Sequence, residues 1–333
     1  MTNETVQTPV VPTLPGALGP AIIHTRNLTK QFGEEVAVRD VTFDVPPGQI
    51  FGFIGPSGSG KTTTIRLLTG YYAPTSGEVA VFGRPPTKFK QDTRERVGYM
   101  PQLFVLYPHL SVWENLNFVA SIYGMSPFRG KRLNAILDFV EMKKDKRKLA
   151  REISGGMQRR LSLAATLIHD PELIFLDEPT AGIDPVLRQK FWDHFRELRQ
   201  AGRTLFVTTQ YVSEANYCDL VGVMTEGALL TVDTPAGLRH QAYGGEILDL
   251  QASEPLDYQT EYRLRDLPFV KKGQVRRTGP NSLRLTVDEA STAIPALLEW
   301  CRDNNIPVES VEEFTPPFDD VFVELVQKVS SHA

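Results

Sequence analysis

The chain has 333 residues, which is long enough for one large domain and a smaller one. Its formal net charge of −4 argues against a nucleic-acid-binding protein that relies on bulk electrostatics. Its two cysteines, Cys218 and Cys301, lie far apart in the sequence, which fits a reducing compartment. No apolar run approaches the roughly 20 residues that span a bilayer, so we expect any membrane role to come through a separate chain.

Residues 1–20 are rich in Thr and Pro and lack a basic region followed by an apolar core. They predict a disordered leader rather than a secretory signal. Over residues 21–244 strand-like and helical patterns alternate, with a mainly helical stretch after Gln102, which predicts an α/β domain. The apolar runs "QIFGFIG", "LIFL" and "TLFVTT" suit a parallel sheet covered on both faces.

A glycine-rich segment, "GPSGSGKTT", lies between a predicted strand and a predicted helix and matches the pattern G-x-x-x-x-G-K-[ST]. The backbone N–H groups of such a loop surround phosphate oxygens, and the following helix presents its positive end to them. We expect Lys61 to reach the β- and γ-phosphates and the Thr62 hydroxyl to bind Mg²⁺. The predicted nucleotide-binding residues here are Gly55, Pro56, Ser57, Gly58, Ser59, Gly60, Lys61, Thr62 and Thr63.

Two adjacent carboxylates follow the apolar run "LIFL". Asp177 closes this strand, so its side chain is expected at the carboxyl edge of the sheet, where ligands of open α/β folds bind. It is the predicted Mg²⁺ partner of Thr62. Glu178 is the predicted general base, which would orient and deprotonate an attacking water while Asp177 holds the metal.

Several ordered motifs resemble those of the ATP-binding cassette (ABC) family. The stretch "ISGGMQRR" (153–160) resembles the family's signature, residues 99–102 resemble its glutamine loop, "AGIDP" (181–185) its D-loop, and "TTQYVSEANYCD" its switch loop and following helix. Phe32 sits where an aromatic residue of this family stacks on adenine. The resemblance implies a P-loop NTPase domain with antiparallel β and helical subdomains over residues 21–244, and ATP and Mg²⁺ as cofactors.

The same resemblance implies a head-to-tail dimer of ATP-binding domains. Ser154, Gly155 and Gly156 of one domain would cap the γ-phosphate held by the other, so that ATP closes the dimer and hydrolysis opens it. Gln102 would bind Mg²⁺ and sense the attacking water, passing closure to a membrane partner. Asp184 would communicate across the dimer.

The switch position departs from the family pattern, because Gln210 stands where most relatives have histidine. One interpretation is a degenerate site that binds ATP but hydrolyses it poorly. The other is a working switch, in which the glutamine amide donates the same hydrogen bond without a titrating group. The intact Lys61, Thr62, Asp177 and Glu178 favour the working switch, and "TTQY" also resembles ATPases of the daunorubicin-exporter type.

Residues 245–333 change in character and predict a small α+β accessory domain. In its last segment Phe318, Val321, Phe322 and Leu325 recur at the spacing of one helix face. The domain resembles the extension of exporter ATPases of the drug-resistance type. A brace for the dimer and a passive stabilising cap both fit this pattern.

Taken with the motifs, the resemblance implies an ATP-binding and hydrolysing subunit of an ABC transporter. We expect it to export hydrophobic or amphipathic compounds through a separate integral-membrane permease, to lie at the cytoplasmic face of the cell membrane, and to bind no nucleic acid. The segment "LFVLYPHLSVWENL" is expected to form either the permease groove or the core of the helical subdomain. The alternative is a non-transport ABC ATPase that regulates a membrane or ribosomal partner, since such a protein shares every ATP motif.

Overall fold

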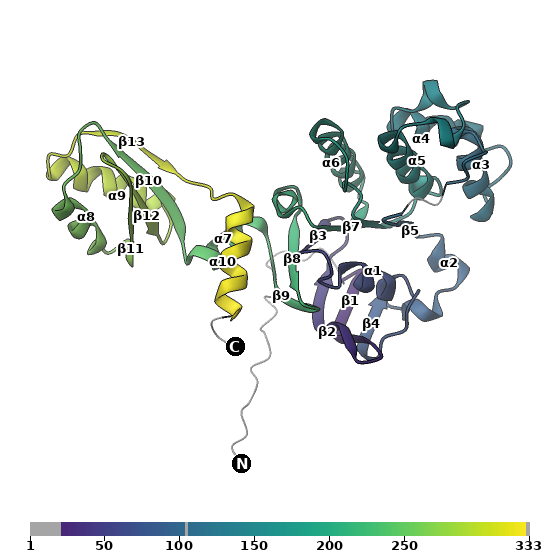
Figure 1. Ribbon diagram of the computed structural model, residues 1–333, viewed down its shortest axis with the longest axis horizontal. Coiled ribbons are helices and arrows are strands. Elements are labelled where there is room, and N and C mark those ends of the chain that lie inside the picture. Colours follow the sequence, from purple (N-terminus) through teal and green to yellow (C-terminus); the bar gives the residue numbers. More distant parts are fainter. Residues whose placement is uncertain (1–20, 104–105, 331–333) are drawn as a thin grey trace, which may run out of the picture. The chain divides into compact units, whose positions relative to one another are not determined.

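The computed structural model describes residues 21–103 and 106–330 (Figure 1). The leader expected over residues 1–20 lies outside them. The chain divides into two compact units, Met1–Val232 and Asp233–Ala333. This division precedes helix α7 (Pro235–Tyr243), whereas the sequence placed the boundary after it. Gly244, the last residue of the domain expected over residues 21–244, ends α7, because it adopts a left-handed φ of 74° and donates its N–H to the carbonyl oxygen of His240.

The first unit is built on a six-stranded sheet in the order β5-β6-β7-β3-β8-β9. The strands are β3 (Ile50–Ile54), β5 (Val97–Met100), β6 (Leu173–Asp177), β7 (Thr204–Thr209), β8 (Leu220–Thr225) and β9 (Ala228–Asp233). From β5 to β8 neighbouring strands are parallel, and every residue of β3, β6 and β7 is buried. The predicted covered parallel sheet is therefore confirmed, and the loops after β3, β6 and β7 meet at its carboxyl edge.

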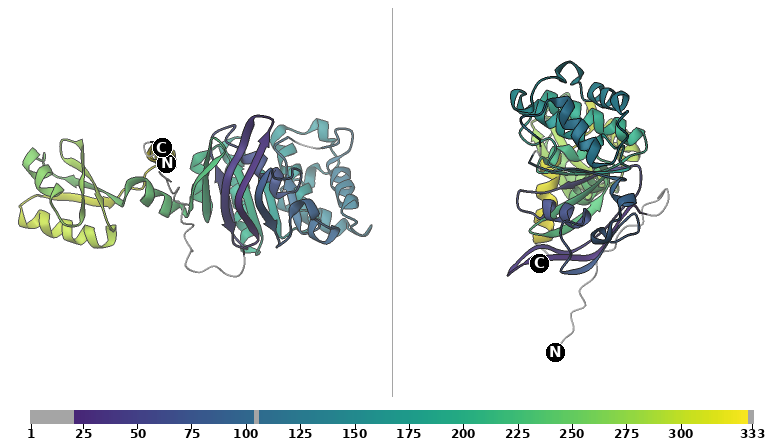
Figure 2. Two further views of the ribbon diagram at one scale, coloured as in Figure 1. Left: turned by 90° about the horizontal axis from the view of Figure 1, so that it is seen from below. Right: turned by 90° about the vertical axis from the view of Figure 1, so that its right-hand side faces the viewer.

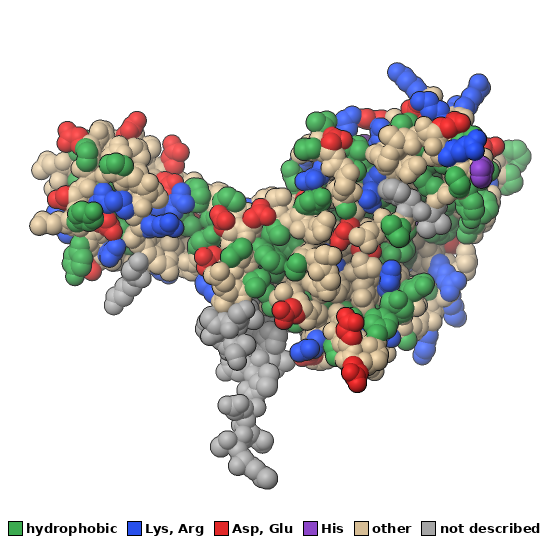
Figure 3. All heavy atoms as spheres, in the orientation of Figure 1, with side chains coloured by type: hydrophobic (Ala, Val, Ile, Leu, Met, Phe, Trp, Pro, Cys, Tyr) green, Lys and Arg blue, Asp and Glu red, His purple; other side chains and the backbone are tan. Residues whose placement is uncertain are grey.

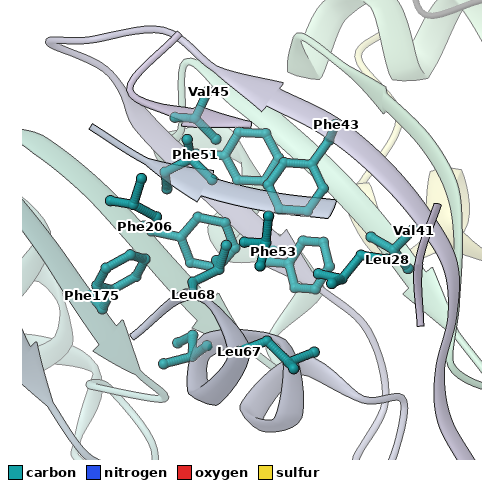
Figure 4. Packing of buried hydrophobic residues seen from close by; sticks show 14 of the residues in the cluster. Leu28, Val41, Phe43, Val45, Phe51, Phe53, Leu67, Leu68, Phe175 and Phe206 are labelled. Carbon is teal, nitrogen blue, oxygen red and sulfur yellow. The ribbon is translucent and has the colours of Figure 1, made fainter. Parts of the chain in front are cut away.

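A second, antiparallel sheet in the order β2-β1-β4 consists of β1 (Ile23–Phe32), β2 (Glu35–Val45) and β4 (Ser76–Val81), drawn in purple to blue in Figure 2. Buried aromatic rings join it to the parallel sheet (Figure 4). Phe43 of β2 stacks on Phe51 of β3 with 5.4 Å between ring centroids, and Phe51 stacks on Phe206 of β7 at 5.2 Å. This packing fixes the antiparallel sheet against the strands that precede the phosphate and switch loops.

The helices of the first unit include α1 (Lys61–Leu68), α2 (Gln91–Arg94), α3 (Val112–Ile122), α4 (Gly130–Phe139), α5 (Gly155–Leu167) and α6 (Pro185–Gln200). Short 3₁₀ helices cover Pro86–Lys88 (η1), Lys143–Asp145 (η2), Ala150–Glu152 (η3) and Val212–Tyr217 (η4). Helices α3 to α5 confirm the mainly helical stretch after Gln102. The helix expected after the switch loop is only the 3₁₀ turn η4, because the chain enters β8 directly after it.

The second unit contains an antiparallel sheet in the order β11-β12-β10-β13, formed by β10 (Glu246–Ala252), β11 (Val270–Gly279), β12 (Ser282–Val287) and β13 (Val308–Glu313). Helices α8 (Tyr258–Arg265) and α9 (Ala290–Asp303) accompany this sheet in Figure 1. Leu250, Leu285 and Leu297 belong to a separate buried core. This unit thus has the α+β composition that the sequence predicts.

The last helix, α10 (Phe318–Ser330), packs against α7. Phe318, Val321 and Leu325 are buried, as their helical spacing predicts, and the guanidinium of Arg239 lies 5.4 Å from the Phe318 ring centroid. Among the helices of residues 21–103 and 106–330, none combines the length and the apolar character that crossing a membrane requires.

Candidate nucleotide-binding site

The phosphate loop connects β3 to α1 at the carboxyl edge of the parallel sheet. Its backbone turns through Gly60, which has a φ of 100° and immediately precedes the helix. A Cβ at this position would lie 2.4 Å from the carbonyl oxygen of Ala37, so both the conformation and the space require glycine. The loop therefore leaves the N-terminus of α1 open toward solvent, where an anion is favoured.

A pocket of about 530 Å³ lies over this loop. Eight predicted site residues line it: Ser57, Gly58, Gly60, Lys61, Thr62, Thr63, Gln102 and Glu178. Five further lining residues were not predicted: Glu35, Val36, Ala37, Glu226 and Gly227. The structure thus brings the phosphate loop, the glutamine loop and the proposed general base together around one space.

The unpredicted residues come from the start of strand β2 and from the turn between β8 and β9. Glu226 and Gly227 form a turn between β8 and β9 with φ angles of 48° and 79°. The Gly227 N–H donates to the Ser59 carbonyl oxygen at 3.2 Å, and the Gly227 carbonyl oxygen accepts from the Arg39 N–H at 2.7 Å. A Glu-Gly pair between two apolar runs is a hairpin signal, but its contact with the phosphate loop depends on tertiary packing.

Lys61 is held across the loop by backbone oxygens. Its Nζ donates to the carbonyl oxygens of Gly55 and Pro56, both at 2.8 Å, and lies 3.9 Å from Glu178 Oε1. Burial lowers the pKa of the Lys61 ammonium, whereas the nearby carboxylates of Glu178 and Asp177 act in the opposite direction. The ammonium is therefore a buried positive charge placed where phosphate oxygens would add acceptors.

Asp177 and Thr62, the two predicted Mg²⁺ ligands, are in direct contact. Asp177 Oδ1 accepts from the Thr62 hydroxyl at 3.0 Å and from the Thr208 hydroxyl at 2.7 Å. Its other oxygen, Oδ2, is buried without a hydrogen-bond partner among the described residues. Burial raises the pKa of Asp177, and the two hydroxyl hydrogen bonds lower it.

This donor set fits Mg²⁺. A buried carboxylate oxygen without a partner lies beside a hydroxyl, and Mg²⁺ sites commonly combine one or two protein oxygens with phosphates and water. In the described part of the chain no cluster of three or more His, Cys, Asp or Glu side chains could hold a metal ion by itself. A divalent cation held here would therefore depend on the phosphates of the nucleotide for the rest of its ligands.

Glu178 adopts a left-handed backbone conformation, with a φ of 48°. Its N–H donates to the carbonyl oxygen of Thr208 at 3.1 Å and contacts the Thr208 hydroxyl at 3.0 Å. Its carboxylate accepts from the Gln102 side-chain amide at 2.9 Å. The predicted base and the predicted glutamine loop are therefore in direct contact, although they lie far apart in the sequence.

Some predicted residues do not line this pocket, namely Gly55, Pro56, Ser59, Asp177, Gln210 and Phe32. Gln210 is exposed just after β7, next to Thr209, whose carbonyl oxygen accepts from the Gly55 N–H at 3.4 Å. Phe32 is 41% exposed at the end of β1, and its ring packs edge-to-face on Tyr72. The switch and adenine-stacking roles of Gln210 and Phe32 stay predictions.

The signature and D-loop residues begin two helices. The Ser154 side chain caps α5 by accepting from the Met157 N–H at 3.3 Å, and Asp184 caps α6 by accepting from the Leu187 N–H at 2.9 Å. Ser154, Gly155 and Asp184 are exposed, and neither motif lines the pocket over the phosphate loop of the same chain.

Comparison with known proteins identifies the family. Residues 38–181 match the family model described as ABC transporter. The Nod factor export ATP-binding protein I of Cupriavidus metallidurans is 36% identical over 260 residues, which cover 75% of this chain and 86% of that protein. The chain belongs to the ABC transporter family.

Other ABC proteins match different shares of the chain. The probable multidrug ABC transporter ATP-binding protein YbhF of Escherichia coli is 36% identical over 246 residues, covering 74% of this chain but only 43% of YbhF. The solved ATP-binding subunit of an ABC transporter superimposes with a TM-score of 0.61 at 25% identity, covering 66% of this chain and 92% of the solved one. This ABC chain thus carries an ATP-binding cassette followed by a further unit.

Proposed function

We propose that this chain is the ATP-hydrolysing subunit of an ABC exporter and acts through a separate integral-membrane permease. The observation that carries the proposal is the contact between the Gln102 amide and the Glu178 carboxylate beside the phosphate loop. It joins the candidate base to the segment that the family uses to pass closure to a permease. The exporter role is supported by relatives named for multidrug transport and for Nod factor export.

The proposed chemistry uses the residues around the pocket. The loop N–H groups and the N-terminus of α1 bind the phosphates, and Lys61 offsets the charge that develops on the transferred γ-phosphoryl group. Thr62 and Asp177 would hold Mg²⁺, with Gln102 beside it, and the ion supplies further charge neutralisation when bound. Glu178 orients the attacking water and accepts its proton, while Gln102 fixes the Glu178 carboxylate.

The dimer in this proposal is formed by two cassettes packed head to tail. The signature residues 154–156, of which Ser154 and Gly155 are exposed, lie at the start of helix α5, and a helix N-terminus favours an anion. Since they do not line the pocket of their own chain, they are available to the γ-phosphate bound by a second copy. A solved ATP-binding cassette that superimposes with a TM-score of 0.59 at 25% identity, over 64% of this chain and 98% of that one, is a dimer bound to ADP and Pi.

The permease would dock at a groove of about 760 Å³ in the first unit. Tyr71, Phe89, Tyr99 and Ile122 are among its lining residues, and Tyr71 and Ile122 are 74% and 64% exposed. Figure 3 shows further hydrophobic side chains exposed on the outer side of the helical region around α3. The groove combines these aromatic and apolar side chains with polar ones such as Arg66 and Arg94, a mixed lining that suits a short amphipathic helix of a partner.

None of the described residues of the segment expected to form the permease groove lines this one. Tyr107 packs edge-to-face on Phe118, with 4.6 Å between ring centroids, and both rings stay partly exposed. Phe104 lies outside the described residues. The proposal therefore assigns permease contact first to Tyr71 and Ile122, and places the chain at the cytoplasmic face of the membrane that holds the permease.

The test is to isolate the tagged chain from detergent-solubilised membranes and to identify the co-purifying chains by mass spectrometry. We expect a stoichiometric polytopic membrane protein whose recovery falls with Tyr71→Ala and is unchanged by Tyr258→Ala, since Tyr258 is an equally exposed tyrosine of the second unit. The recovered complex should hydrolyse ATP at least about 10²-fold faster than its Glu178→Gln form. Recovery of ribosomal proteins, or equal rates for the two forms, would overturn the proposal.

A further inference from the structure

Arg159 lies in the second turn of α5, and the chemistry above gives it no role. It is 8% exposed. Its guanidinium reaches three backbone carbonyl oxygens on three different segments. Nη1 donates to Gln102 at 3.4 Å and to Glu178 at 3.2 Å, and Nη2 donates to Ala181 at 2.8 Å. These segments are the glutamine loop, the end of β6 and the start of the D-loop.

The hydrogen bond from Arg159 to the Glu178 carbonyl oxygen helps to hold an unfavourable backbone conformation. Glu178 has a left-handed φ of 48°, which costs energy for any residue with a Cβ and persists only where the surroundings hold it. Thr208 fixes the N–H side of this residue, and Arg159 fixes the carbonyl side. With both sides held, the Glu178 side chain is directed toward Gln102 and the phosphate loop.

Arg159 also connects these loops to the signature of the same chain. It belongs to the helix that Ser154 caps, and five residues of α-helix span roughly 7.5 Å. A helix moves as a rigid rod over so short a distance. A shift of the signature residues therefore shifts the guanidinium that holds Glu178.

We propose that Arg159 is a positioning residue that holds Glu178 and Gln102 in their hydrolytic arrangement and ties this arrangement to the signature helix of its own chain. The proposal rests on the proposed function, since it assumes ATP hydrolysis by a dimer of cassettes. It assigns Arg159 to the site of its own chain, not to the site that its signature caps in the partner copy.

The neighbouring Arg160 provides a matched control. It has the same chemistry and sits on the same helix, but its Nη1 donates to the carbonyl oxygen of Val140 at 3.4 Å and lies 3.6 Å from Glu141 Oε2. Both contacts belong to the helical region. Removing Arg160 therefore tests the general cost of losing an arginine from α5.

The experiment compares Arg159→Met, Arg159→Lys and Arg160→Met in the purified transporter complex, with kcat and KM for ATP as readouts. For Arg159→Met we expect kcat to fall by about 10²-fold with little change in KM, because Glu178 is misplaced while nucleotide contacts stay intact. Arg159→Lys should lie between this variant and the wild type, since the compact ammonium has one nitrogen in place of the separate Nη1 and Nη2 donors of the planar guanidinium. Arg160→Met should keep the wild-type kcat.

Equal kcat values for Arg159→Met and Arg160→Met, in a complex whose wild type hydrolyses ATP, would overturn the positioning role and leave the proposed function intact. A wild type no faster than Glu178→Gln would instead contradict the proposed function. If Arg159→Met does not fold, Arg159→Lys decides: a wild-type kcat for this variant also overturns the proposal.

Dimers whose two chains carry different tags test whether Arg159 acts on the site of its own chain. One chain carries Glu178→Gln with or without Arg159→Lys, and its partner is wild type. Because Arg159 acts on the Glu178 of its own chain, adding Arg159→Lys to the inactive chain should leave the remaining rate unchanged. A clear fall in that rate would overturn the assignment and place the effect in the opposite site.

Discussion

At the residue scale, the absence of a titrating group at position 210 has a consequence for pH. Glutamine stays neutral, whereas histidine changes charge near a pKa of about 6.5. If Gln210 is a working switch, Gln210→His should retain ATP turnover and add a pH-dependent change centred near pH 6.5 that the wild type lacks. The measurement is kcat for ATP between pH 5.5 and 8.5. Turnover in Gln210→Ala equal to the wild type would show that the side chain is not the switch.

The environment of Asp177 leads to a prediction about the stability of the nucleotide-free protein. Burial raises its pKa in the folded protein above the unfolded value, so the contribution of Asp177 to stability is present below its unfolded pKa and is lost as pH rises through the folded pKa. At neutral pH the ionised carboxylate therefore destabilises the nucleotide-free protein. Its Oδ2 atom, which lacks a hydrogen-bond partner among the described residues, agrees with this view.

We expect Asp177→Asn to stabilise the nucleotide-free protein by about 0.5–2 kcal/mol at pH 7 and to abolish Mg²⁺-dependent ATP turnover. The amide oxygen can still accept from Thr62 and Thr208, so the fold should be kept. Urea unfolding at pH 7 measures the first effect. Thr208→Val is the comparison, because it removes a hydroxyl from Asp177 without removing the charge. A less stable Asp177→Asn protein would contradict the account.

At the scale of elements, helix α6 and the turn η4 are joined by an ion pair between a partly exposed arginine and a buried glutamate. Glu214 of η4 is 1% exposed, and its Oε1 lies 3.7 Å from Arg188 Nε of α6. The same guanidinium lies 4.2 Å from the Tyr211 ring centroid. Since Asp184 caps α6, this pair connects the D-loop helix to the switch loop.

Arg188→Ala should destabilise the protein by about 1–3 kcal/mol, because it leaves the buried Glu214 carboxylate without its nearest positive charge. The double variant Arg188→Ala with Glu214→Gln should recover part of this loss, since the uncompensated charge is gone. Chemical unfolding of the two single variants and the double variant measures the coupling. Strict additivity of the two losses would show that the pair does not interact.

The site residues that belong to contiguous sequence motifs could be predicted, whereas those that reach the site through tertiary contacts could not. Lys61, Thr62, Asp177 and Glu178 lie within contiguous motifs, so local sequence was enough to select them; three of them line one pocket, and Asp177 accepts a hydrogen bond from Thr62. Thr208 contacts Asp177 and Glu178 only because β6 and β7 are parallel neighbours. The turn at Gly227 reaches the phosphate loop only through tertiary packing, and no local pattern indicates it.

For the fold, too, local patterns predicted the elements, whereas their tertiary contacts could not be predicted. Buried runs such as "LIFL" predicted parallel strands correctly, because a strand covered on both faces is apolar throughout. The two compact units divide at Val232, before α7, whereas the expected domain ranges divide after Gly244, which is the end of that helix in the structure. Hydrophobic spacing cannot show that α7 packs against α10, since those helices lie far apart along the chain.

At the scale of the whole molecule, each unit has its own buried core. All residues that line the nucleotide pocket belong to the first unit. A chain ending at Val232 should therefore still fold and bind ATP. A chain ending at Gly244 should be less soluble, because α7 would lose α10 and expose Leu238 and Ala242.

Nucleotide affinity and solubility of the two truncated chains provide the measurement. Binding by the shorter chain with a dissociation constant like that of the full-length protein would support the division at Val232. Better solubility of the longer chain would favour the boundary after α7. The comparison separates these outcomes because the two truncations differ by little more than this one helix.

The turn at Glu226 and Gly227 determines whether residues can be inserted at this point of the chain. Gly227 is bonded on one side to the phosphate loop and on the other to β2, so the turn acts as a spacer of fixed length between two sheets. An added residue would displace one of those bonds, whereas surface turns generally accept insertions. The turn after α6, where Gly202 has open space around its Cα, offers such a surface position. Engineered tags or reporter peptides should therefore be accepted near Gly202 and rejected at Gly227, although both are short, glycine-containing turns.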